Sequence, residues 1–256
     1  MRKLRQRAQE PARSPGRKRR EQRMPRPRAH LLRAAGTSGV DVSHYQGEVD
    51  WAKVSKGGIS FAIAKATEGE TAVDSEFAVN WKGIKQAGLV RGAYHFFRPK
   101  KDPMTQAKSF VKTVGKLDKG DLPPALDVEV DDGASATAIL GGIGTWLAHV
   151  EGAMKVKPMI YTRASFWKSH CNDSNQFASY PLWVSHYTVA NEPTLPSAWK
   201  SWMLWQHSDK GSVKGVEGQV DLNRSQDTLR QLVRLAIGGR MSRRAGRKRK
   251  GRQALK

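Results

Sequence analysis

The chain has 256 residues and a formal net charge of +22 at pH 7, and this charge is concentrated at its two ends. Residues 1–36 contain 13 Lys and Arg against two acids, residues 239–256 contain nine against none, and the body between them carries only +2. Self-repelling basic ends with little apolar surface predict two disordered tails around one folded domain at 37–238. The chain has a single cysteine, so it cannot form an internal disulfide. It contains no apolar run of about 18 residues, so the sequence predicts no membrane span.

Short runs rich in Val, Ile and aromatic residues alternate with segments of helical period, which is typical of β/α units around a parallel sheet. In chain order, strands are expected near 38–43, 59–66, 90–97, 124–130, 157–162, 181–186, 202–207 and 217–222. Helices are clearest at 75–87, 104–116, 136–154 and 226–236. Eight strands suggest a barrel. Because 187–201 has weak helical period and contains two prolines, we expect an α/β fold: an irregular TIM-like β/α barrel with some helices missing in its last third.

One pair of acids on the fourth predicted strand is the sharpest candidate for chemistry. Asp127 and Glu129 are two residues apart, so they point to the same face and lie about 6.5 to 7 Å apart along the strand. Leu126 and Val128 would then pack outward against helices. Burial and mutual repulsion keep one such carboxyl protonated beside an ionised partner, as glycoside hydrolysis requires.

The competing interpretation is a structural ion pair, with Lys65 on the second strand as the partner. For an isolated Asp-x-Glu we would favour that interpretation. Here Asp41 and Asp221 fall at other strand ends, where the reacting groups of β/α barrels gather, so we favour an active site.

Aromatic and imidazole side chains also gather at predicted strand ends. Tyr94, Tyr161, Trp183 and Trp205 could pack against the C–H faces of sugar rings, although core packing alone would explain about half of them. The histidines near strand ends, which raise the alternative of a metal-dependent hydrolase, are His44, His95, His186 and His207. No two of them share a strand at His-x-His spacing, so we expect no metal and no other cofactor, and we interpret these histidines as hydrogen-bonding members of a polar pocket.

Six ordered motifs between about residues 38 and 236 resemble the glycoside hydrolase family 25 lysozymes. They are Gly39-Val40-Asp41-Val42-Ser43-His44-Tyr45-Gln46-Gly47, Ala64-Lys65-Ala66-Thr67-Glu68-Gly69, Gly92-Ala93-Tyr94-His95-Phe96, Leu126-Asp127-Val128-Glu129, Trp205-Gln206 and Val220-Asp221-Leu222-Asn223. The resemblance implies hydrolysis of the β-1,4 bond between N-acetylmuramic acid and N-acetylglucosamine in peptidoglycan.

The resemblance also implies roles for particular residues. Glu129 would be the general acid, and Asp127 would orient the substrate's N-acetyl group or stabilise developing positive charge. Asp41 and Asp221 would be supporting carboxylates of the same pocket. The residues expected to bind the sugar chain are Tyr94, Tyr161, Trp183, Trp205, Gln206 and His44. Whether the second step uses a covalent ester or the substrate's acetamido group stays open, although the close acid pair suits the substrate-assisted route.

Two positions depart from the family pattern, and the basic tails lie outside it. Tyr45 stands where Trp is common, and Ser225 stands where an aromatic is usual. The charge of the tails is interpreted either as a site of non-specific contact with polyanions or, equally, as a solubilising charge run. Met24 could begin a shorter chain.

Several expectations concern partners and location. We expect peptidoglycan glycan strands as the substrate, a monomer, no specific nucleic-acid partner and no transmembrane segment. The site of action should be the cell wall or outside the cell, although no signal-peptide stretch is visible. Two alternative functions remain: a polyanion-binding protein carrying a non-catalytic carbohydrate-binding barrel, and a chitinase-like hydrolase.

Overall fold

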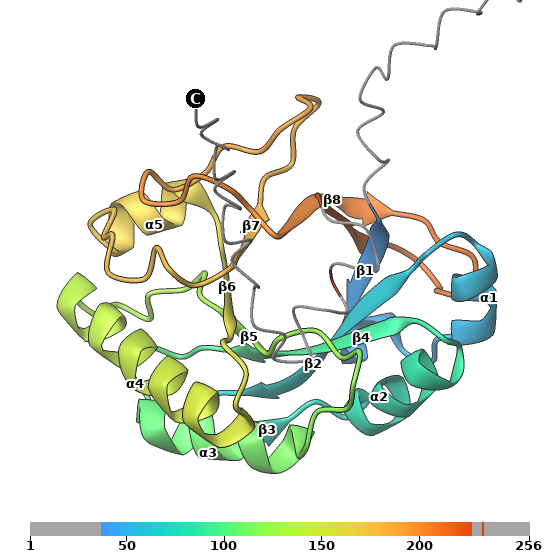
Figure 1. Cartoon of the computed structure of the whole chain (residues 1–256), viewed down its shortest axis with the longest axis horizontal. Helices are drawn as coiled ribbons and strands as arrows, with labels where there is room; N and C mark the ends of the chain where they lie inside the picture. The colour runs from blue at the N-terminus through green and yellow to red at the C-terminus, as the bar shows by residue number, and fades with distance from the viewer. Residues whose placement is uncertain (1–36, 227–231, 233–256) are drawn as a thin grey trace, which may run out of the picture. The chain divides into compact units, whose positions relative to one another are not determined.

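The computed structural model describes residues 37–226 and residue 232, which form the strands and helices of a barrel (Figure 1). The strands are β1 (Ser38–Val42), β2 (Phe61–Glu68), β3 (Ala72–Val73), β4 (Val90–Phe96), β5 (Ala125–Asp127), β6 (Met159–Thr162), β7 (Leu182–Ser185), β8 (Leu204–Gly211) and β9 (Val220–Ser225). The helices are η1 (His44–Gln46), α1 (Trp51–Lys56), α2 (Phe77–Gln86), α3 (Pro103–Val114), α4 (Ala136–Met154) and α5 (Ala164–His170).

Eight of these strands close into a barrel, as the sequence predicts. Their order is β1-β9-β8-β7-β6-β5-β4-β2, and pairing of β1 with β2 completes the ring, while the short β3 adds to the outer part of β2. The strands of the ring pair in parallel except at β9, which is antiparallel to both β8 and β1; outside the ring, β3 is antiparallel to β2. The prediction of a wholly parallel sheet is therefore wrong at the last strand, because a short hairpin rather than a helix joins β8 to β9.

Side chains alternate between the inside and the outside of the barrel along each strand. On β2, Phe61 and Ile63 belong to the apolar cluster that fills the barrel, whereas Ala62 and Ala64 belong to the cluster beneath the helices. Gly39 on β1 faces inward, and a Cβ atom there would lie 2.3 Å from the ring of Phe61. The base of the barrel is thus packed shut, so open space can exist only toward the other end.

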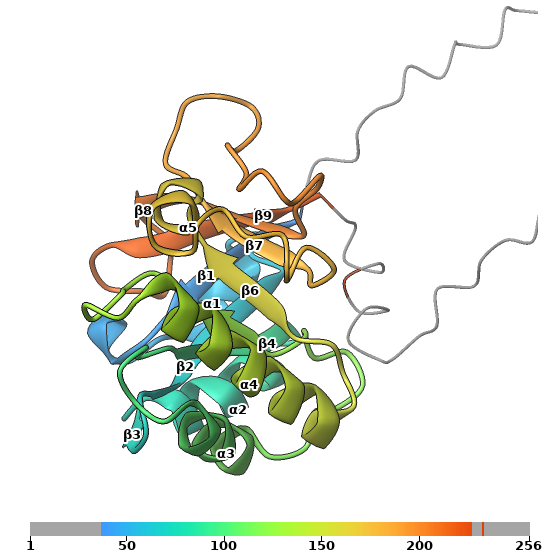
Figure 2. The same cartoon turned by 90° about the vertical axis from the view of Figure 1, so that its left-hand side faces the viewer.

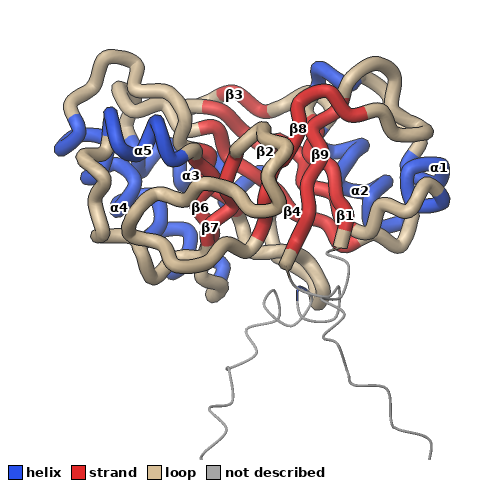
Figure 3. Tube along the Cα trace, turned by 90° about the horizontal axis from the view of Figure 1, so that it is seen from above, coloured by secondary structure: helices blue, strands red, loops and turns tan. Residues whose placement is uncertain are grey.

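The helices cover the outside of the barrel and are absent from its last third. Seen from above, α3, α4 and α5 lie on one side of the strands and α1 and α2 on the other (Figure 3). Between β7 and β9, the described residues contain no helix; a long loop joins β7 to β8, and the short hairpin joins β8 to β9 (Figure 2). This arrangement confirms the expected irregular barrel, and no described helix is long and apolar enough to cross a membrane.

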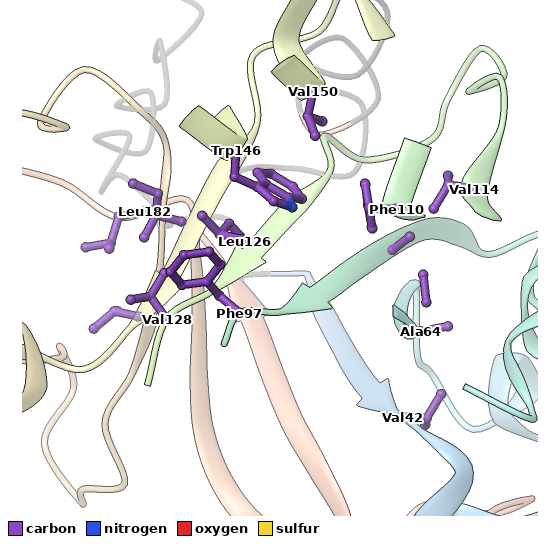
Figure 4. Close-up of a cluster of buried hydrophobic side chains, with 14 of the residues drawn as sticks. Val42, Ala64, Phe97, Phe110, Val114, Leu126, Val128, Trp146, Val150 and Leu182 are labelled. Carbon is purple, nitrogen blue, oxygen red and sulfur yellow. The ribbon is translucent and has the colours of Figure 1, made fainter. Parts of the chain in front are cut away.

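The largest apolar cluster holds α3 and α4 against β5 and its neighbours (Figure 4). Trp146 of α4 and Phe110 of α3 are fully buried there, together with Leu126 and Val128. Burial of a side chain of this size stabilises the fold by about 1.5 to 3 kcal/mol. As the sequence predicts, the residues that flank Asp127 pack outward, and this packing fixes which way the acid points.

Most predicted helices agree with the structure within a few residues. The predicted segments 75–87, 104–116 and 136–154 correspond to α2, α3 and α4. Prediction missed α1 and α5, which are too short to show several helical periods, and it missed the two-residue β3. The predicted helix 226–236 falls largely outside the described residues, as do the two basic tails.

Candidate active site

A cavity of about 190 Å³ lies where the parallel strands of the barrel end. Its lining residues are Asp41, Val42, Ser43, Tyr45, Gln46, Lys65, Tyr94, Phe96, Asp127, Glu129, Tyr161, Trp183, Gln206 and Asp221. The fold therefore brings together all four predicted carboxylates with four of the six predicted sugar-binding residues. No three His, Cys, Asp or Glu side chains of the described part of the chain are grouped as ligands for a metal ion.

Asp127 and Glu129 enter this cavity from β5 and the residues that follow it. Asp127 is buried, and burial together with the neighbouring Glu129 charge raises its pKa well above the ordinary value. Glu129 is only half-buried; burial raises its pKa also, and the opposing charge of Arg163 limits the rise. The pair therefore favours a shared proton over two negative charges, since two adjacent carboxyls in a desolvated site do not ionise together.

Lys65 does not form the ion pair that the structural interpretation requires. Its Nζ atom lies 2.6 Å from Oε2 of Glu68, on the same strand, although Lys65 also lines the cavity. Within residues 37–226, no Lys or Arg forms an ion pair with either Asp127 or Glu129. The Oδ1 atom of Asp127 is buried without any hydrogen-bond partner. An unsatisfied buried carboxylate oxygen is costly, so it is more consistent with a ligand site than with a structural bridge.

Asp41 and Asp221 form a second carboxyl pair across the β1–β9 ladder, where they are directly opposite each other. The Asp41 Oδ2 atom accepts hydrogen bonds from Nδ2 of Asn223 at 2.6 Å and from Nε2 of Gln206 at 3.0 Å. The same Gln206 nitrogen donates to Oδ2 of Asp221 at 3.1 Å. One amide group thus spans both carboxyls and sets their relative position.

The two carboxyls of this second pair differ in how well they hold a negative charge. Burial raises the pKa of Asp41, but its hydrogen bonds from Gln206 and Asn223 oppose the rise. Burial and the adjacent Asp41 charge raise the pKa of Asp221 to about 8. At neutral pH we therefore expect Asp41 to be the anion and Asp221 to carry a proton.

The antiparallel direction of β9 explains how Asp221 reaches the cavity. Sequence analysis places Asp221 near the end of a strand that finishes at 222, but β9 begins at Val220 and continues to Ser225. Because β9 runs opposite to its neighbours, its first residues, not its last, lie at the mouth of the barrel.

Three of the aromatic side chains that line the cavity pack against one another. The ring of Trp183 packs edge-on against Tyr161 at 4.7 Å and against Tyr94 at 6.2 Å between centroids. The indole nitrogen of Trp183 donates to Oδ1 of Asn223 at 2.8 Å, which satisfies its only polar atom. These rings belong to, or pack against, the apolar cluster inside the barrel and lie next to the carboxyls. The carboxyl groups are therefore supported by tightly packed side chains.

The family model described as Glycosyl hydrolases family 25 matches residues 40–216, which includes every strand that contributes a carboxyl except β9. The chain belongs to glycoside hydrolase family 25. This family 25 member is a glycoside hydrolase, and the resemblance inferred from its motifs is confirmed.

The chain is also similar to individual proteins. The chain is 41% identical over 205 residues to YegX of Escherichia coli K12, covering 78% of this chain and 73% of YegX. It is 38% identical over 212 residues to Lysozyme M1 of Streptomyces globisporus, covering 79% of this chain and 72% of that protein. A bacterial lysozyme from Streptomyces coelicolor has a similar crystal structure, with a TM-score of 0.77 at 36% identity, covering 80% of this chain and 99% of that one.

Two predicted sugar-binding residues of this family 25 enzyme lie outside the cavity. Trp205 is 1% exposed and packs in the outer apolar cluster, where its Nε1 atom donates to the carbonyl of His186 at 2.8 Å. Since alternate residues of a strand face opposite sides, Trp205 must point outward when Gln206 points inward. His44 lies on η1 and lines an adjacent depression. The burial of Trp205 corrects the sugar contact predicted for it, whereas sugar binding by His44, beside the cavity, stays a prediction.

Sequence reasoning overlooked several residues at the cavity. Tyr45 is 82% exposed at its mouth, and the hydroxyl of Tyr187, which is also exposed, donates to Oε1 of Gln206 at 2.8 Å. Asn223 holds both Asp41 and Trp183. The motifs contained Tyr45 and Asn223, but a motif does not show which side chains face the cavity. Asn223 lies two residues after Asp221, and residues two apart on a strand face the same side, so this spacing could have identified Asn223.

Proposed function

We propose that this family 25 enzyme is a muramidase that hydrolyses the β-1,4 bond between N-acetylmuramic acid and N-acetylglucosamine in bacterial peptidoglycan, in cell-wall catabolism. The observation that carries this proposal is the convergence of Asp41, Asp127, Glu129 and Asp221 on one cavity with aromatic walls. The similarity to Lysozyme M1 and to the Streptomyces coelicolor lysozyme supports the choice of substrate.

In this proposal Glu129 is the general acid. It must be protonated in the resting enzyme and must still reach the glycosidic oxygen, so it needs both a raised pKa and access. Burial raises the pKa of Glu129, and its side chain is less deeply buried than that of Asp127. Glu129 would donate its proton to the leaving oxygen as the bond from that oxygen to the anomeric carbon breaks.

Asp127 is proposed to position the N-acetyl group of the sugar that is cleaved. Asp127 lines the cavity, and its buried Oδ1 atom has no hydrogen-bond partner among the described residues, so this carboxyl retains an acceptor for the acetamido N–H. Held in this way, the acetamido carbonyl oxygen attacks the anomeric carbon while the leaving group departs. Water then opens the cyclic intermediate, and the Glu129 carboxylate takes a proton from that water.

Asp41 and Asp221 are proposed to balance the charge of this reaction. The positive charge that develops at the anomeric carbon is stabilised by a nearby anion, and Asp41 is the carboxylate best supplied with hydrogen-bond donors. Asp221, protonated at neutral pH, can donate a hydrogen bond. Tyr94, Tyr161 and Trp183 would contact the sugar rings from the cavity wall.

The test of the proposed acid compares Glu129→Gln with the native enzyme in lysis of purified cell walls. We expect a loss of at least about 100-fold, the usual share of a general acid. The matched control is Glu151→Gln on α4, outside the cavity, where the new amide oxygen can still accept the hydrogen bond from Tyr180. Equal lysis by Glu129→Gln and native enzyme would disprove the assignment of the acid.

Mass spectrometry of cell-wall digests tests the substrate bond. A muramidase leaves a new reducing end on N-acetylmuramic acid, whereas a new reducing end on N-acetylglucosamine would identify a glucosaminidase.

We also propose that residues 37–238 are the catalytic domain and that the basic segments 1–36 and 239–256 are dispensable for chemistry. Deleting both segments should leave turnover of soluble glycan fragments intact. Binding without any turnover by the full chain would instead support a polyanion-binding protein.

A further inference from the structure

The cavity is small compared with the polymer that it is proposed to act on. At about 190 Å³, it lies below the range of roughly 300 to 1,000 Å³ that is usual for pockets enclosing a drug-sized ligand. Sugar units on either side of the cleaved bond must therefore rest on the rim. Exposed aromatic side chains at the rim are the natural candidates to hold them, because a sugar ring buries its C–H face against an aromatic face.

Tyr45 is the aromatic residue at the mouth with the most exposed ring. It lines the cavity and yet is 82% exposed, which is unusual for a large aromatic ring. Its backbone is fixed by a capping box. The backbone N–H of Tyr45 donates to Oγ of Ser43 at 3.3 Å, and that of Ser43 donates to Oε1 of Gln46 at 2.9 Å. The exposed ring therefore stands on a rigid turn and not on a loose loop.

The neighbouring His44 supports the ring of Tyr45 from behind. The two ring centroids are 4.1 Å apart with an interplanar angle of 37°. The His44 Nδ1 atom lies 2.7 Å from Oδ2 of Asp74, and the backbone N–H of His44 donates to the same oxygen at 3.0 Å. The Asp74 side chain is almost fully buried, and its other oxygen accepts from the backbone N–H of Glu76. A buried carboxylate thus fixes the imidazole, and the imidazole fixes the tyrosine.

His44 also faces a second depression, of about 250 Å³, next to the catalytic cavity. Lys65 lines both spaces, so they adjoin. Because Nδ1 of His44 faces Asp74, its Nε2 atom is the ring nitrogen left to contact a ligand, and within residues 37–226 it makes no hydrogen bond. An exposed ring face beside a ring nitrogen combines apolar contact with hydrogen bonding, as a sugar with its hydroxyls requires.

We propose that Tyr45 and His44, anchored by Asp74, form a rim subsite that binds a sugar unit at the mouth of the catalytic cavity. Tyr45 provides the stacking face, His44 provides a hydrogen bond and positions Tyr45, and Asp74 positions His44. The ligand is a β-1,4-linked amino-sugar polymer, so this inference rests on the proposed function. The subsite makes binding depend on chain length, because only a fragment that extends past the mouth of the cavity can cover the exposed ring of Tyr45.

The binding experiment uses the full chain with Glu129→Gln, so that fragments are not cleaved. Soluble peptidoglycan glycan fragments of increasing length are titrated calorimetrically into this parent and into the parent with Tyr45→Ala. We expect about tenfold weaker binding of the long fragments and little change for the shortest. Tyr45→Trp should bind the long fragments at least as well as the parent. Val189→Ala, which shortens another fully exposed apolar side chain, serves as the control.

Two outcomes separate the subsite from the proposed function. Equal binding of long fragments by the parent and by Tyr45→Ala overturns the subsite while leaving the muramidase proposal in place. Absence of binding by the parent at every fragment length overturns both. Since the Tyr45 side chain is exposed, its truncation should leave the thermal unfolding midpoint unchanged, and loss of binding cannot then be attributed to misfolding.

The positioning role of His44 has its own readout in an otherwise native enzyme. His44→Ala should raise KM for long glycan about threefold with kcat unchanged, because the ring behind Tyr45 is lost but the reacting groups are not. His44→Phe keeps a ring against Tyr45 and should restore part of the KM. A fall in kcat with unchanged KM, or identical behaviour of the two variants, would contradict the positioning role of the ring.

Discussion

Replacing Gln206 by Met would remove the amide group that connects both sides of the candidate active site. Gln206 is 2% exposed. Its Oε1 atom accepts hydrogen bonds from the hydroxyls of Tyr161 and Tyr187, both at 2.8 Å, and its Nε2 atom donates to Asp41 and Asp221. Met has a similar length and no hydrogen-bonding group of comparable strength, so the change removes four hydrogen bonds with little change in volume.

The expected cost follows from which partners remain unsatisfied. Tyr161 is buried and loses the acceptor for its hydroxyl, which costs about 1 to 3 kcal/mol. Asp41 keeps the hydrogen bond from Asn223 but loses one bond to a charged oxygen, worth about 1.5 to 3 kcal/mol. Tyr187 is exposed and can bond to water instead. We therefore expect the free energy of unfolding to fall by about 2.5 to 6 kcal/mol.

Urea unfolding of the native enzyme and of Gln206→Met measures this difference directly. The control is Gln86→Met at the exposed end of α2, which should change the free energy of unfolding by less than about 0.5 kcal/mol. If Gln206→Met lowers the free energy of unfolding by less than about 1 kcal/mol, with an unchanged denaturant slope, the inference that this amide connects the carboxyls to the tyrosines is refuted.

Two further predictions concern pH. The pKa of Asp221 is raised to about 8 in the folded chain, so its stabilising contribution is complete below about pH 4 and is lost as the pH rises toward 8. Asp221→Asn removes this loss, so its stability relative to the native enzyme should increase as the pH rises from about 4 to about 8. A constant difference in unfolding midpoint between the two proteins over that range would be inconsistent with a protonated Asp221. Burial lowers the pKa of His95 to about 4, so His95 should cost the fold stability, up to about 3 kcal/mol, as the pH falls from about 6.5 to 4. Comparing acid unfolding of His95→Gln with that of the native enzyme measures this part, and an identical acid response in both would contradict it.

The strand pattern of this enzyme was largely readable from its sequence because its physical cause is local. Inward and outward residues alternate along a strand, and apolar runs such as Phe61–Ala66 carry that pattern within a few positions. The same alternation correctly placed Asp127 and Glu129 on one face and Leu126 and Val128 on the other. The direction of β9 was not readable, because parallel and antiparallel strands have similar local patterns and differ in the connection between them.

Two of the predicted site residues show what local reasoning could not decide. Trp205 and His44 stand in the sequence beside residues that line the cavity, but Trp205 is buried on the outer side of its strand and His44 lines the adjoining depression. For Trp205 the alternation rule itself gives the answer once Gln206 is known to face inward. For His44 it does not, because the strand has already ended and the direction of its ring depends on Asp74, which is 30 residues away.

The sequence by itself determined which side chains are available for chemistry: an acid pair at period-two spacing, further acids near other strands, and ordered motifs that resemble one family. Only the tertiary structure decided which of those groups meet and in what state. Closure of the ring by β9 puts Asp221 opposite Asp41, burial then raises the pKa of each, and the amide of Gln206 joins the two. The reason is that desolvation and charge coupling act between groups that are close in space, wherever they lie along the chain.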